Sequence, residues 1–192
     1  MELNENDLIL GVDLSCNSTG VCIINSKRNI IHAESINPYP LDGIFRLNYI
    51  YDRLLTILTS YDIKIIGYEK QLQQQRYSYS AGSILPLAEV QGIFKLSLVK
   101  SFPFLQKSLV IYSFKPQDLK ISLSGDPKAD KGKMIESLGV RRINHLKSNV
   151  VESSVNDCAD AYAAADAALK VYNHSFDRDY DIVYAADVNL SV

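Results

Sequence analysis

The chain has 192 residues, of which 47% are hydrophobic, and a formal net charge of −2 at pH 7. This length suits a single domain of ordinary size, and the hydrophobic share is sufficient to bury a core without disulfides. No apolar stretch reaches the roughly 18–20 residues that a membrane-spanning helix needs, so we expect no membrane partner. The three cysteines show no metal-binding spacing, and the amino terminus is acidic and polar rather than a secretory signal, which predicts a cytoplasmic protein with reduced thiols.

The basic residues are concentrated in one part of the chain. Residues 115–147 contain eight Lys or Arg and four acidic residues, a net charge of +4. Residues 148–192 contain two basic and eight acidic residues, a net charge of −6. The net charge by itself argues against nucleic-acid binding, but a local basic segment can bind phosphate groups while the rest of the chain stays neutral.

The first 36 residues predict an antiparallel sheet of three strands. Apolar runs at 8–14, 20–25 and 30–36 have the length and composition of strands. Turn-forming residues at 15–18 and 27–29 separate them. Strands joined by such short turns form a meander in which each strand pairs with the next.

Strands and helices alternate in the remainder of the chain. Apolar residues recur at helical spacing between Asp42 and Tyr61, which predicts an amphipathic helix. The other expected elements are strands at 63–68 and 108–113 and helices at 81–100, 118–122, 129–138 and 156–172. Together they predict one α/β domain over residues 1–172, with a central mixed five-stranded sheet flanked by helices. An acidic tail follows over residues 173–192, and the pattern assigns no structure to it.

Four carboxylates occupy positions that suit a metal site. Asp13 and Glu69 each end an apolar strand, where burial of an unpaired charge is costly. Asp157 and Asp160 lie three residues apart at the start of the last predicted helix and therefore share one face. A turn role for Asp13 and the helix dipole for the acid pair explain those residues alone, but no simple explanation fits Glu69. Together the four indicate a site for hard cations such as Mg²⁺, two of which can clamp a phosphate during hydrolysis.

In these motifs the chain resembles the RuvC Holliday-junction resolvases, which are nucleases of the RNase H-like superfamily. The matching residues are Gly11-Val12-Asp13 with Thr19-Gly20, Tyr68-Glu69-Lys70-Gln71 after a strand, Asp157-Cys158-Ala159-Asp160-Ala161 in the last helix, and two lysines eleven residues apart, Lys120 and Lys131. The resemblance covers roughly residues 8–172 and implies the RNase H-like fold. It does not extend to the acidic tail.

The resemblance implies a metal-dependent, structure-selective endodeoxyribonuclease that resolves four-way (Holliday) and related branched DNA junctions by paired nicks. Such an enzyme holds two Mg²⁺ or Mn²⁺ ions per active site, here on Asp13, Glu69, Asp157 and Asp160. Lys131 would lie at the scissile phosphate, and Lys120 would act there or hold the strand nearby. The family further implies a homodimer in the cytoplasm of a bacterial or phage-infected cell, and its dimer contact resembles the helix at 81–100.

Other basic residues of the central segment fit contacts to the DNA backbone, which position DNA without reading its sequence, and a solvated surface is their alternative role. They are Lys115, Lys128, Lys133, Arg141 and Arg142. Leu72 departs from the family, because it stands where the family has an aromatic residue that intrudes at the junction centre. Arg76, Tyr77 and Tyr79 either replace that residue by stacking on bases or are the packed residues of a loop.

Three other functions fit parts of the pattern. A sugar kinase or actin-like ATPase shares the opening strands, but it needs a second large domain and Gly-rich phosphate loops. A ribonuclease of the RNase H type would act on RNA–DNA hybrids and would prefer an A-form duplex. A junction-binding module would bind branched DNA without cutting it. Metal-dependent cleavage separates the enzymes from the binding module, and substrate preference separates the two nucleases.

Overall fold

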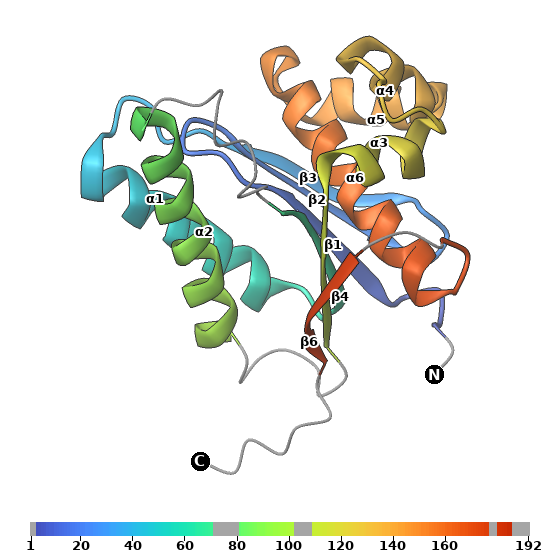
Figure 1. Cartoon of the computed structure of the whole chain (residues 1–192), viewed down its shortest axis with the longest axis horizontal. Helices are drawn as coiled ribbons and strands as arrows, with labels where there is room; N and C mark the ends of the chain where they lie inside the picture. The colour runs from blue at the N-terminus through green and yellow to red at the C-terminus, as the bar shows by residue number, and fades with distance from the viewer. Residues whose placement is uncertain (1–2, 71–80, 102–108, 177–179, 186–192) are drawn as a thin grey trace.

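The computed structural model describes residues 3–70, 81–101, 109–176 and 180–185, and these form three layers (Figure 1). A mixed sheet of six strands lies in the middle, with the order β3-β2-β1-β4-β5-β6. Helices α1 and α2 cover one face of the sheet, and helices α3 to α6 cover the other (Figure 1). Each face of the sheet contributes to one of two buried apolar clusters.

The predicted meander is present. It consists of β1 (Leu8–Asp13), β2 (Thr19–Asn25) and β3 (Ile30–Ile36), and each strand is antiparallel to the next. Next to β1 lies β4 (Ile63–Glu69), and next to β4 lies β5 (Val110–Phe114), both in parallel pairing. The mixed character of the predicted sheet is therefore confirmed, and the carboxyl ends of β1, β4 and β5 lie at the same edge of the sheet. We call this edge, defined by Asp13, Glu69 and Phe114, the carboxyl edge.

The helices divide between the two faces. On one face lie α1 (Gly43–Ser60) and α2 (Ala81–Ser101). On the other lie α3 (Pro116–Ser124), α4 (Lys131–Ser137), α5 (Val140–Asn149) and α6 (Val155–Tyr172). A single 3₁₀ turn at Glu152–Ser154 precedes α6. Carboxylates cap two of them: Asp42 accepts a hydrogen bond from the Gly43 amide, and Asp130 accepts one from the Lys133 amide. None of the described helices is both long and apolar enough to cross a membrane.

Two elements were not predicted. Helix α5 carries its apolar residues Val140, Ile143 and Leu146 three apart, but its mean composition is strongly polar, so the spacing is easily missed. Strand β6 (Tyr180–Ala185) pairs antiparallel with β5 and raises the number of strands from the expected five to six. Its Tyr180 ring packs edge-on against Tyr112 of β5, with the ring centroids 5.5 Å apart. The aromatic and β-branched residues of this segment are typical of a strand, but they lie within an acidic tail to which the sequence analysis assigns no structure.

The main chain of helix α6, as well as its buried side chains, lies against the sheet. A Cβ atom at Gly11 of β1 would lie 2.6 Å from the Ala165 nitrogen, and a Cβ atom at Gly20 of β2 would lie 2.6 Å from the carbonyl carbon of Asp157. Real Cβ atoms essentially never approach other atoms this closely. Glycine at these two positions, with the Ala-rich face of α6, therefore fixes where the first turn of α6 meets the sheet.

Candidate metal centre

Two of the four predicted carboxylates leave the sheet side by side. Asp13 is the last residue of β1, and Glu69 is the last residue of β4. The two strands are parallel neighbours, and Val12 pairs with Tyr68 directly before the acids. Both carboxylates therefore emerge at the carboxyl edge, where ligands bind in open α/β sheets.

Helix α6 brings the other two carboxylates to the same place. Asp157 lies in its first turn, and its main chain rests on Gly20. Gly20 is also the residue that pairs with Asp13 across the β1–β2 ladder. Gly20 thus contacts the backbone of Asp157 and pairs with Asp13 in the neighbouring strand. Asp160 follows three residues later, and its charge acts on both Asp13 and Glu69.

The acids at this edge perturb one another. Burial, followed by the neighbouring charges of Asp160, Glu69 and Asp157, raises the pKa of Asp13 to about 8. Burial, followed by the charge of Asp160, raises the pKa of Glu69 to about 7. The pKa of Asp160 is also raised, chiefly by burial. Partly buried carboxylates that repel one another are stabilised by any cation placed among them.

The two predicted catalytic lysines act on the same carboxylates. Lys120 lies on α3, and its charge lowers the pKa of Glu69 and of Asp160. Lys131 is the first residue of α4, and its charge lowers the pKa of Asp13 and of Asp160. In both cases the lysine opposes the larger effect of burial. The structure therefore gathers all six residues predicted to be catalytic around one edge of the sheet.

Sequence reasoning missed two serines that hold Asp157. The Ser18 hydroxyl donates a short hydrogen bond to Oδ2 of Asp157. The Ser35 hydroxyl lies 3.0 Å from the same Oδ2 and 2.7 Å from the Ser18 oxygen. Ser18 comes from the β1–β2 turn and Ser35 from β3. Their only sequence signal is a serine in a turn and a serine in a strand, and neither points to an acid more than 120 positions away.

The donor set fits a hard divalent cation, because all four groups offer carboxylate oxygens and none offers sulfur or imidazole. Among the described residues, no group of three or more His, Cys, Asp or Glu side chains is already arranged to hold an ion. The backbone positions and the mutual charge effects bring the acids to one edge, so an ion would complete the site by drawing the side chains together.

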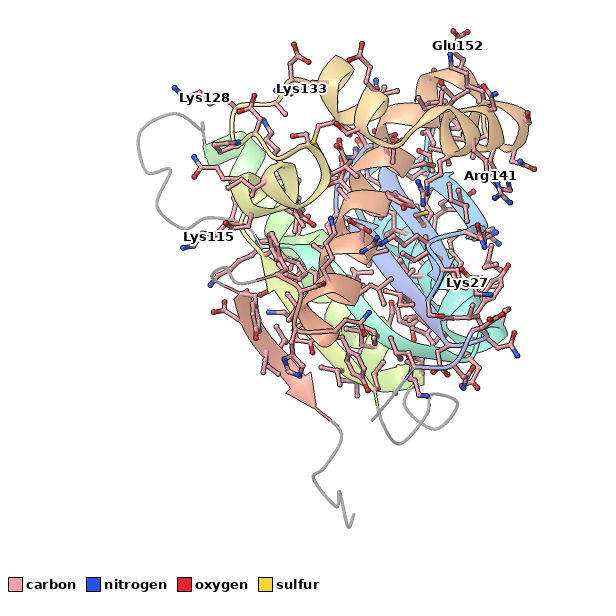
Figure 2. All side chains as sticks on the ribbon, turned by 90° about the vertical axis from the view of Figure 1, so that its right-hand side faces the viewer. Lys27, Lys115, Lys128, Lys133, Arg141 and Glu152 are labelled. Carbon is pink, nitrogen blue, oxygen red and sulfur yellow. The ribbon has the colours of Figure 1, made fainter. Side chains whose placement is uncertain are left out.

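The predicted DNA-contacting residues divide into three groups. Lys115, Lys128 and Lys133 lie along one side of the molecule, and Arg141 lies on the opposite side (Figure 2). The Lys133 ammonium also pairs with Asp126 at 2.6 Å. Arg76, Tyr77 and Tyr79, together with Leu72, lie outside the described residues.

Arg142 is engaged within the protein. Its Nε donates to the main-chain oxygen of Arg28 at 3.0 Å, and its Nη1 donates to that of Leu138, also at 3.0 Å. The guanidinium carbon lies 5.4 Å from the centroid of the Tyr162 ring, in cation–π geometry. These contacts join α5 to the β2–β3 turn and to α6. Arg142 therefore helps to hold α5 in place, and its predicted contact with DNA stays a prediction.

Comparison with known proteins gives a consistent result. The family model described as crossover junction endodeoxyribonuclease RuvC matches residues 9–167. The enzyme of that name from Thermotoga petrophila is 27% identical over 161 residues, covering 82% of this chain and 88% of the relative. Its counterpart from Caldicellulosiruptor saccharolyticus is 27% identical over 166 residues, covering 82% and 89%.

Solved structures share the fold. The T. thermophilus RuvC in complex with a Holliday junction substrate superimposes with a TM-score of 0.67 at 18% identity, covering 88% of this chain and 97% of that one. The yeast mitochondrial Holliday junction resolvase gives a TM-score of 0.57 at 15% identity, covering 88% and 80%. These likenesses confirm the predicted RNase H-like fold.

Proposed function

Because the chain belongs to the RuvC family of crossover junction endodeoxyribonucleases, we propose that it cuts four-way and related branched DNA in a metal-dependent reaction. The observation that carries this proposal is the gathering of Asp13, Glu69, Asp157 and Asp160 at one edge of the sheet, with two lysines beside them. The names of the relatives, and the junction bound to one of the solved structures, support branched DNA as the substrate.

Family membership implies dependence on a divalent cation. The four carboxylates would hold two ions, Mg²⁺ or Mn²⁺, because oxygen donors suit both. When bound, such ions stabilise negative charge on the attacking and leaving oxygens of the phosphodiester. Ser18 and Ser35 would keep Oδ2 of Asp157 in one orientation, as groups behind a metal ligand commonly do.

Lys131 and Lys120 would act on the phosphate rather than on the ions. Both are cations within the electrostatic range of Asp160, so a phosphodiester held beside the carboxylates by bound ions would lie close to their ammonium groups. Charge that develops on the phosphate oxygens in the transition state would be stabilised by these fixed positive groups. Lys115, Lys128 and Lys133 lie along one side of the molecule and would contact the backbone of the flanking DNA.

We also propose a homodimer, which would place two active sites on one junction. Leu85, Leu96 and Val99 of α2 are exposed, and their spacing puts them on one face of the helix. Ile44 and Phe45 at the start of the adjacent α1 are also exposed. Exposed apolar side chains gathered on two neighbouring helices are typical of a protein interface. Light scattering should give twice the chain mass, and Val99→Asp should reduce it to one chain.

Cleavage assays test the function. A labelled four-way junction, a linear duplex and an RNA–DNA hybrid would each be incubated with Mg²⁺ or with EDTA. Paired nicks on the junction alone, lost in EDTA, would support the proposal. Cleavage of the hybrid in preference to the junction would assign the chain to the ribonuclease alternative. Tight junction binding without cleavage under any metal condition would leave a binding module.

A further inference from the structure

A hollow of about 490 Å³ lies between the β2–β3 turn and helix α5, away from the candidate metal centre. Nine described residues line it, and none of them is acidic. The turn contributes Lys27 and Asn29, and α5 contributes Arg141, His145 and Asn149. Figure 2 shows Lys27 and Arg141 on the same side of the molecule. A concave surface with cations and amide or imidazole donors, and without carboxylates, is suited to an anion.

The two walls of this hollow are fixed to each other and to the core. Arg142 lines the hollow from α5 and donates to the main-chain oxygen of Arg28 in the facing turn. The Arg28 guanidinium in turn lies 2.7 Å from the carboxylate of Asp166, a buried residue of α6. The separation of the walls is therefore set by folding rather than by whatever enters between them.

The cations at the rim are available to a ligand. Arg141 is exposed, and no described carboxylate forms an ion pair with it. Lys27 pairs with Glu5, but both side chains are more than half exposed. Exposed pairs of this kind contribute little, so a phosphate could replace Glu5 as the partner of Lys27.

Resting on the function proposed above, we propose that this hollow binds the phosphate backbone of a DNA arm at a distance from the cutting site. The seven residues of β2 run from Thr19, next to the Gly20 that pairs with Asp13, to the turn that bears Lys27. That strand spans about 20 Å. Along one strand of a duplex, successive phosphates lie about 3.4 Å apart on the helix axis. The hollow would therefore meet the backbone roughly six nucleotides from the scissile bond.

Salt dependence provides the first test, with binding measured in EDTA so that no DNA is cut. Each lost phosphate contact lowers the slope of log affinity against log salt concentration by about 0.9. We expect Arg141→Ala to lower the slope by about one unit and to weaken junction binding several-fold. Lys147→Ala is the matched control, because Lys147 is an exposed cation of the same helix that does not line the hollow. Equal slopes for both variants and the wild type would overturn the proposal.

Neutral methylphosphonate linkages locate the contact on the DNA. Placed one at a time from three to ten nucleotides from the cleaved bond, they should weaken wild-type binding most near the sixth position and should not weaken Arg141→Ala further there. Interference at that position in both proteins alike would contradict the assignment to Arg141. If the chain binds junctions but cuts nothing, the proposed function fails while these binding results still decide the role of the hollow. Failure to bind any DNA would overturn both.

Discussion

The Ser35 hydroxyl lies 3.0 Å from Oδ2 of Asp157, which links the middle of β3 to the first turn of α6 across 122 positions of sequence. Ser18 donates to the same oxygen from the β1–β2 turn. Of the four candidate metal ligands, Asp157 is thus held by hydroxyl groups as well as by the position of its backbone. Because both serines bind Oδ2, Oδ1 is the oxygen of Asp157 that is available to a cation.

We expect Ser35→Ala to weaken the response to metal without unfolding the protein. Loss of a group that orients a metal ligand typically costs 10–100-fold in metal affinity or activity. The Mg²⁺ concentration that gives half of the maximal cleavage rate should therefore rise at least about tenfold. Ser137→Ala is the matched control, because that hydroxyl is exposed and bonds only within its own helix, to the Lys133 carbonyl oxygen. An unchanged half-maximal Mg²⁺ concentration for Ser35→Ala would show that Ser18 alone suffices.

Asp13→Asn should abolish cutting and leave junction binding largely intact. The substitution removes a carboxylate from the carboxyl edge but keeps its shape. We expect a loss of at least roughly 10²–10³-fold in single-turnover cleavage, because an ion held more weakly would stabilise the transition-state charge less, and one such stabilising contact contributes about this much. Binding measured in EDTA should change little. A variant that still cuts at the wild-type rate would disprove the assignment of Asp13 as a ligand.

The stability of the metal-free protein should fall as the pH rises from about 5 to about 8. The folded-state pKa values of Asp13 and Glu69, about 8 and about 7, lie above their ordinary values near 4. Between those limits the folded state binds more protons than the unfolded state, so stability decreases with pH.

Thermal unfolding in EDTA at several pH values measures this slope. Asp13→Asn should flatten it and should raise Tm at pH 8, because one of the repelling charges is gone. Adding Mg²⁺ should raise Tm more at pH 8 than at pH 5, since the ion competes with protons for the same oxygens. A metal-free Tm that rises between pH 5 and pH 8 in the wild type, with the same slope in Asp13→Asn, would contradict the raised pKa values.

Gly20→Ala should displace the start of α6 from the sheet. Its Cβ would lie 2.6 Å from the Asp157 carbonyl carbon, in a contact between backbones that cannot relax by a rotamer change. We expect the free energy of unfolding to fall by about 1–3 kcal/mol. The cleavage rate should fall by more than the decrease in the folded fraction accounts for. Gly92→Ala is the control, because a Cβ there meets nothing within 4 Å and alanine favours a helix interior. That variant should be at least as stable as the wild type, and only stability is compared, because Gly92 lies on the same face of α2 as the proposed dimer contact.

Lys131→Ala should lower the cleavage rate more than it lowers affinity for the junction. A cation that acts on charge developing in the transition state contributes to the rate, whereas a plain phosphate contact contributes equally to binding. Single-turnover rates and binding constants should be compared with those of Lys133→Ala, a neighbour on the same helix whose ammonium pairs with Asp126. Equal losses of rate and affinity in Lys131→Ala would make it a backbone contact.

The positions of the four carboxylates could be predicted because each depends on a local pattern. Apolar runs ending in Asp13 and Glu69 indicated strand ends, and the spacing of Asp157 and Asp160 indicated one helix face. The topology then followed from the order of the elements, since parallel strands place their carboxyl ends at one edge. The predicted strand ends and helix face agree with the structure, because at these positions the local pattern and the fold require the same element.

The partners of these residues could not be predicted from local pattern. A serine in a turn and another in a strand carry no mark of the acid that they hold, because that contact exists only after α6 crosses the meander. The charge of Arg142 predicts a DNA contact, but its two carbonyl partners and the Tyr162 ring could not be predicted, because these contacts form only in the packed chain. Strand β6 has strand-favouring residues, but its pairing with β5 depends on an open sheet edge that local pattern does not show.

The contact between α6 and Gly11 and Gly20 also determines when the carboxylates are brought together. Side chains can repack, but a helix whose main chain rests on a strand can slide only by lifting off the sheet. The repulsion among the acids is therefore overcome once, during folding, by burial of the alanine-rich helix. An arriving ion would have only side chains to order and no backbone, so less of the attraction between ion and carboxylates would be lost to conformational entropy.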